Sequence, residues 1–160
     1  MSAREMLDEW IARMEPVLGT PPEAPGERET VSFDCGDGLD VHAGAFAPYD
    51  RLRLFATLVV APEDRQAMGR LMQDALRVNL GLPGVFPGGI GLSPDAREFV
   101  LCAWYPVSAA DVEGLDQRLA DFIAVCREIR ERFEELSSLP SSGLFTEESA
   151  RPSRSESNDW

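Results

Sequence analysis

Apolar residues recur at helical spacing in three stretches of the chain, and the first lies at the N-terminus. It follows a Ser2-to-Glu5 pattern that suits a capping box. Gly19 and the prolines that follow it end the helix and begin a linker. The apolar stripe of this helix comprises Leu7, Trp10, Ile11, Met14 and Leu18.

The second and third helical stretches are both preceded by helix-start signals. A proline at position 62, followed by Glu63 and Asp64, predicts the start of the second helix. The third helix follows a capping pattern at 108–111 and keeps its three-and-four spacing over 112–136. The stripe of the second helix comprises Met68, Leu71, Met72, Ala75, Leu76 and Leu80.

Alternating apolar and polar residues predict five short strands between these helices. They cover residues 30–33, 39–45, 51–61, 89–92 and 98–105. The turn at 34–38 has hairpin chemistry, with Asp37 and Gly38 suited to positive φ. The strand at 51–61 ends in a continuous apolar run, which predicts a central strand covered on both faces or a strand near an interface.

The order of these elements predicts an α+β fold. We expect an antiparallel twisted sheet of about five strands and three helices in the order α-β-β-β-α-β-β-α. At 160 residues the chain suits one domain, which we assign to residues 1–136. Residues 137–160 are rich in Ser and Glu and poor in apolar residues, so we predict a disordered acidic tail there.

Composition and charge exclude several classes of partner. A formal net charge of −13 argues against nucleic acid, since phosphate recognition needs clustered basic residues. No apolar run approaches the ~20 residues of a membrane helix, and the N-terminus has no signal-peptide pattern. The three cysteines form no CxxC pair, which favours a reducing cytoplasm over a disulfide framework or a zinc site.

No group of residues amounts to an active site. His42 is the only histidine, so neither a multi-histidine metal site nor a triad with a second imidazole can be built. The aspartates between 34 and 40 lack the spacing of a calcium loop. The glycines between 84 and 91 lack a following GK[ST] and helix, which excludes a phosphate loop. We therefore predict no enzyme activity, no cofactor and no metal.

Three passages resemble the type III secretion chaperones of the Tir-chaperone (CesT/SycE) class. They are the helix ending in ALRVNLGL, the hairpin GGIGLSPDAREFVLCAWYPV and the capped helix VSAADVEGLDQRLADFIAVCREIRERFEEL. A "GLxPxxxxFVL" hairpin with a "YPV" exit is the most recognisable of them. The resemblance covers roughly residues 2–136 and consists of hydrophobic spacings and turns. It leaves open whether the chain serves one effector or several, as an export-control chaperone of the HpaB kind does.

The resemblance implies a non-enzymatic, cytoplasmic homodimer of a Gram-negative bacterium. Such a chaperone binds the N-terminal segment of a secreted effector in extended form and presents it to the export machinery and its ATPase. The implied dimer interface comprises Met68, Leu71, Met72, Ala75, Leu76, Ile90 and Leu92. The implied effector-binding residues are Leu7, Trp10, Ile11, Met14, Val31 and Phe33.

Two other interpretations stay open at this point. One is a small enzyme using carboxylates of the 34–40 turn, against which the lack of a second polar cluster counts. The other is a dimeric regulatory or interaction module that is not tied to secretion. Neighbouring genes discriminate between them, since an effector or export-apparatus gene supports the chaperone and a metabolic operon opposes it.

Overall fold

The computed structural model describes residues 1–18, 30–46, 49–84, 87–107 and 112–140. The predicted order of helices and strands is confirmed. In chain order the elements are α1 (Ala3–Leu18), β1 (Thr30–Asp34), β2 (Asp40–Phe46), β3 (Arg51–Val60), α2 (Arg65–Gly81), the 3-10 turn η2 (Leu82–Gly84), β4 (Gly88–Leu92), β5 (Glu98–Pro106) and α3 (Val112–Ser138).

The five strands form one antiparallel sheet in the order β1-β2-β3-β5-β4. Strand β3 is central, as predicted, and pairs with β5 along its whole length from Arg51 to Val60. A register shift between Thr57 and Val59 interrupts this pairing. The sheet therefore has two edge strands, β1 on one side and β4 on the other.

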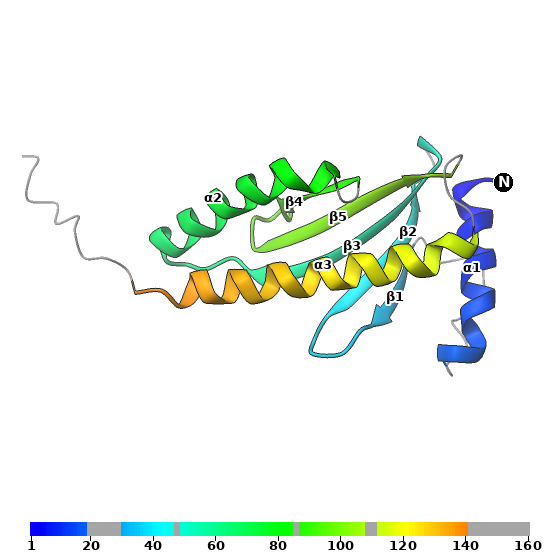
Figure 1. Cartoon of the computed structure of the whole chain (residues 1–160), viewed down its shortest axis with the longest axis horizontal. Coiled ribbons are helices and arrows are strands. Elements are labelled where there is room, and N and C mark those ends of the chain that lie inside the picture. Colours follow the sequence, from blue (N-terminus) through cyan, green and yellow to red (C-terminus); the bar gives the residue numbers. More distant parts are fainter. Residues whose placement is uncertain (19–29, 47–48, 85–86, 108–111, 141–160) are drawn as a thin grey trace, which may run out of the picture.

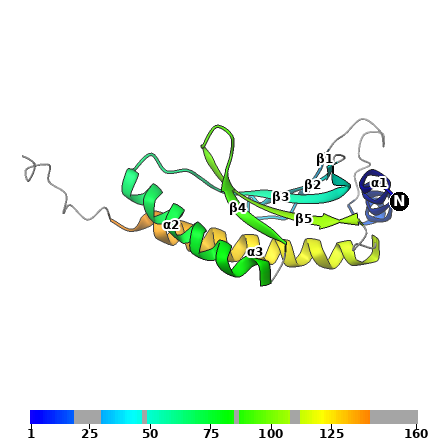
Figure 2. The same ribbon diagram turned by 90° about the horizontal axis from the view of Figure 1, so that it is seen from above.

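The helices lie against one face of the sheet. Figure 2 shows α2 and α3 on the same side of the strands, with α1 at the end of the sheet. Alternate residues of β3 point to these helices and are buried, while the residues between them are partly exposed. No helix of the described residues covers the opposite face. The buried side of β3 comprises Leu52, Leu54, Ala56 and Leu58.

The long helix α3 buries more apolar side chains than either other helix in the described part of the chain, and it runs along the molecule in Figure 1. Its three-and-four spacing buries Leu119, Phe122, Cys126, Ile129 and Phe133. Phe133 meets Phe99 of β5 edge-on, with ring centroids 5.4 Å apart. One continuous core therefore joins all three helices to the sheet.

Some predicted boundaries differ from those observed. Helix α2 begins at Arg65, because Asp64 is its N-cap and its carboxylate accepts from the amide of Ala67 at 2.7 Å. Helix α3 extends to Ser138. The predicted linker, the cap at 108–111 and nearly all of the predicted tail lie outside the described residues.

The ends of the first hairpin and of β3 test two further predictions. Asp37 and Gly38 have φ values of 53° and 66°, which confirms the predicted turn conformation. We predicted that the apolar end of β3 is covered on both faces. That prediction is wrong for the single chain, since Val60 is 72% exposed. Within the described residues, no helix combines the length and the apolar character needed to cross a membrane.

Candidate functional site

A row of large apolar side chains is exposed along α2 and β4. Met72 is 45% exposed, Leu76 67% and Leu80 87%, and these residues follow one another at four-residue intervals on α2. Leu92 of the neighbouring strand β4 adds a further 37% exposed side chain. We call these four residues the α2–β4 surface. A contiguous apolar patch of this kind on a small acidic domain indicates an interaction surface.

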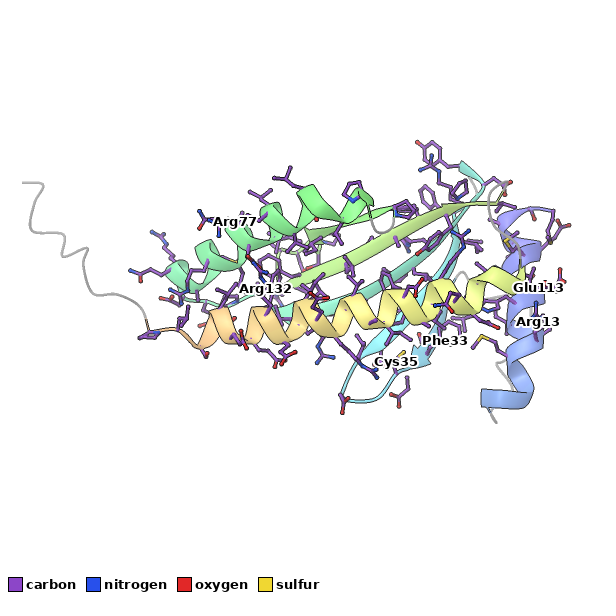
Figure 3. All side chains as sticks on the ribbon, in the orientation of Figure 1. Arg13, Phe33, Cys35, Arg77, Glu113 and Arg132 are labelled. Carbon is purple, nitrogen blue, oxygen red and sulfur yellow. The ribbon has the colours of Figure 1, made fainter. Side chains whose placement is uncertain are left out.

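The opposite side of α2 holds the helix in place. Ala67, Leu71 and Ala75 are buried against the core. The carboxylate of Asp74 is also buried and forms a bidentate ion pair with Arg132 of α3. Arg132 and Arg77 are labelled in Figure 3, which shows Arg132 between α2 and α3 and Arg77 at the outer side of α2. The apolar row is therefore displayed by a helix whose other face is fixed.

Asn79 links α2 to the edge of β4. Its side-chain amide donates to the carbonyl of Ile90 at 2.9 Å, and its oxygen accepts from the amide of Ile90 at 2.7 Å. Because both backbone groups of Ile90 bind Asn79, this point of the edge strand is closed to pairing with another strand. An apolar groove lies beside it, lined by Met72, Ala75, Leu76, Asn79, Ile90, Gly91, Leu92 and Phe99.

The second candidate region is where α1 packs against β1. Trp10 is buried, its ring lies 5.4 Å from that of Phe33, and its Nε1 donates to Asp116 of α3 at 2.7 Å. Ile11 and Met14 of α1 and Val31 of β1 are partly buried against this core. The three side chains therefore form a half-exposed apolar rim around a buried tryptophan, which we call the α1–β1 rim.

The structure divides the predicted binding residues into buried and accessible groups. Of the predicted dimer residues, Leu71, Ala75 and Ile90 are buried, Met68 is half-buried, and Met72, Leu76 and Leu92 are exposed. Of the predicted effector-binding residues, Leu7, Trp10 and Phe33 are buried in the core of the single chain, and the other three form the α1–β1 rim. Both roles stay predictions, and direct contact with a partner falls to the exposed members.

The described residues offer little for bond-making chemistry. The imidazole of His42 is hydrogen-bonded to Ser32 at 2.7 Å and stacked on Phe55. Asp34 accepts from the amide of Gly36 within its own turn. Among the residues with a described position, no three His, Cys, Asp or Glu side chains lie together as a metal site would need. Burial raises the pKa of the Cys126 thiol to about 12, so this cysteine is a core side chain and a poor nucleophile.

Comparison with known proteins identifies the family of the chain. The sequence profile of the Tir chaperone protein (CesT) family matches residues 11–130. The chain belongs to this family. The prediction of a secretion chaperone of the Tir-chaperone class is thereby confirmed. A comparison with curated protein sequences finds no match.

Solved structures share the fold of this CesT-family chaperone at low sequence identity. The ExsC–ExsE complex includes a chain that is 17% identical, with a TM-score of 0.65 over 82% of this chain and 96% of that chain. The HopA1–SchA chaperone–effector complex gives 16% identity and a TM-score of 0.59 over 80% and 95%. The Yersinia pestis type III secretion chaperone SycH, in complex with a stable fragment of YscM2, gives 17% identity and a TM-score of 0.53 over 76% and 98%.

Proposed function

We propose that the chain works in the cytoplasm as a homodimeric type III secretion chaperone. In this account it binds the N-terminal segment of one or more secreted effectors, keeps that segment soluble and partly unfolded, and delivers it to the export apparatus. The observation that carries the proposal is the pair of apolar surfaces on a member of the CesT family, the α2–β4 surface and the α1–β1 rim.

The α2–β4 surface is the one we assign to the dimer. It presents four large apolar side chains that are 37–87% exposed. Complete burial of a fully exposed side chain of this kind contributes about 1.5–3 kcal/mol, and each of the four contributes a share of that in proportion to its exposed area. A twofold axis through this surface packs it against the same surface of a second copy, so the same residues form both sides of the interface. Closure of the β4 edge by Asn79 favours contact through side chains over continuous strand pairing at Ile90.

The α1–β1 rim and the β1 edge are the parts that we assign to the effector. Ile11, Met14 and Val31 are accessible without unfolding the core, and β1 is an edge strand of the sheet. An extended segment can add backbone hydrogen bonds along such an edge while its apolar side chains contact the rim. The segment loses conformational freedom on binding, so a long contact is needed for useful affinity.

The dimer is tested by light scattering of the purified chain. We expect a mass of about 35 kDa at micromolar concentration, since one chain weighs 17.6 kDa. Leu76→Asp places a carboxylate in both halves of the interface and should weaken association by about a hundredfold or more. Leu139→Asp makes the same change at a 50% exposed leucine elsewhere and should leave the dimer intact. A monomeric parent chain would contradict the proposal.

A further inference from the structure

The face of the sheet that no described helix covers carries a connected group of aromatic and arginine side chains. These residues come from β2, β3 and β5 and from the turn before β3, and the strand register places them on the side away from the buried leucines. We call this group the aromatic face. It comprises His42, Phe46, Tyr49, Arg53, Phe55 and Trp104.

Each member of the aromatic face contacts the next. Tyr49 stacks on Phe46 with ring centroids 5.5 Å apart, and Phe46 meets Trp104 edge-on at 5.4 Å. The guanidinium of Arg53 lies 5.6 Å from the Trp104 ring and 4.3 Å from the Phe55 ring. These contacts hold a wide, rigid apolar platform whose outermost member, Tyr49, is 68% exposed.

Arg53 is the unusual member because part of its hydrogen-bonding capacity is unused. Its Nε is buried and has no hydrogen-bond partner, and no carboxylate pairs with its guanidinium among the described residues. Buried donors in native proteins are almost always satisfied. The buried Nε itself is out of reach of a ligand, but the two terminal Nη atoms are not buried and have no hydrogen-bond partner among the described residues. Lying over the Phe55 ring and beside the Trp104 ring, they are well placed to bind a carboxylate that the single chain does not supply.

The local charge also favours an acidic ligand. The chain as a whole carries a formal net charge of −13, yet both charged side chains that β3 presents on this face are arginines, Arg51 and Arg53. The nearby carboxylate of Asp50 accepts from the amide of Ala3 at the start of α1. The part of this face around Arg51 and Arg53 is therefore basic and apolar. The acidic side chains of Asp40 in β2 and Glu98 in β5 lie on this face toward the other end of the strands, where Glu98 accepts from the hydroxyl of Thr57.

We propose that the aromatic face is a second docking site for the secreted partner, and that it binds an extended segment in which a carboxylate side chain is flanked by apolar residues. The carboxylate accepts from the guanidinium of Arg53, while the flanking side chains lie on the Phe46 and Trp104 rings. The inference rests on the proposed function for the identity of the partner. The site itself is separate from the α2–β4 surface and from the α1–β1 rim.

The location is tested by photocrosslinking in the native bacterium under secretion-inducing conditions. Tyr49 in one strain and Met14 in another are replaced by p-benzoylphenylalanine in the full chain. The expected result is an adduct to the same secreted protein from both positions, with the peptide joined to position 49 containing Asp or Glu next to apolar residues. An adduct from position 14 alone, or an adduct of position 49 only to a second copy of the chain, overturns the inference and leaves the proposed function standing. The absence of any secreted-protein adduct at both positions overturns both.

The chemistry is tested with that crosslinked peptide, made synthetically, and purified dimer. Arg53→Gln should weaken binding about tenfold, and a peptide with its carboxylates replaced by amides should lose a similar factor with the parent chain but little with the Arg53→Gln variant. Arg97→Gln, at an arginine whose side chain is 81% exposed in the β4–β5 turn, is the matched control and should bind as the parent does. Unchanged binding by Arg53→Gln, with dimer mass and thermal unfolding like the parent, contradicts the proposal.

Discussion

A few polar side chains on the inner side of α2 fix the orientation of this helix, and with it the exposure of its apolar row. Asp74 is 4% exposed although it is a carboxylate in the middle of an apolar stripe, and Arg132 of α3 supplies its ion pair. Arg70 acts one turn earlier, where its guanidinium donates to the carbonyls of Leu136 and Leu139 near the end of α3. The α2–α3 contact therefore depends on charged groups as well as on apolar packing.

Removing the partner of Asp74 tests this dependence. Arg132→Ala should lower the free energy of unfolding by about 2 kcal/mol, because a buried carboxylate is left unpaired. The value is below that for a fully buried pair, since the Arg132 side chain is 54% exposed and water screens part of the interaction. The measurement is urea unfolding followed by circular dichroism. Arg77→Ala, an exposed arginine of α2, is the control and should change stability little. Equal stability of the two variants would show that the ion pair is not needed.

At the scale of elements, hydrophobic periodicity was enough to predict three helices, five strands and their order. Periodicity works here because the sheet buries alternate residues of β3 and the helices bury one stripe each. It could not divide the stripe of α2 into Leu71, which is buried, and Leu76, which is 67% exposed. That division depends on where α3 and β4 pack against α2, and the local sequence pattern of α2 carries no information about those positions. The same limit hid the contacts of Asn79 and Arg53, whose partners lie on other elements.

The link between α2 and β4 gives a prediction at this scale. Asn79→Ala removes two hydrogen bonds to Ile90 and opens the edge of β4, so we expect a loss of about 1–2 kcal/mol in stability and increased aggregation. Denaturant unfolding and time-resolved light scattering measure the two effects. The control is Gln73→Ala, which truncates an exposed amide on the same helix. If the Asn79 variant aggregates no faster than the control, Asn79 does not protect the edge.

At the scale of the whole molecule, we assign different faces of one small domain to different partners. The α2–β4 surface lies far from α1 in Figure 1, so a second copy of the chain bound there leaves the α1–β1 rim accessible. Buried Trp10 and Phe33 support that rim from within, and the hydrogen bond from Trp10 to the exposed Asp116 of α3 holds the indole in place. Family membership could be predicted from the turns and apolar spacings of the second helix and the last hairpin, because family members share these features in their amino-acid sequences. The residues that contact a partner could not be predicted in this way, because the exposure of each side chain depends on how the whole domain packs.

The proposed function depends above all on binding of a secreted effector through that effector's N-terminal segment. The direct measurement is a pull-down with the tagged full-length chain from its native bacterium under secretion-inducing conditions, followed by mass spectrometry. We expect a protein exported by the type III apparatus to co-purify in stoichiometric amount. Deletion of its N-terminal segment should abolish the interaction. A Met14→Asp chaperone should recover much less of this protein while remaining dimeric. Co-purification of cytoplasmic proteins alone, or retention of the effector without its N-terminal segment, would contradict the proposed function.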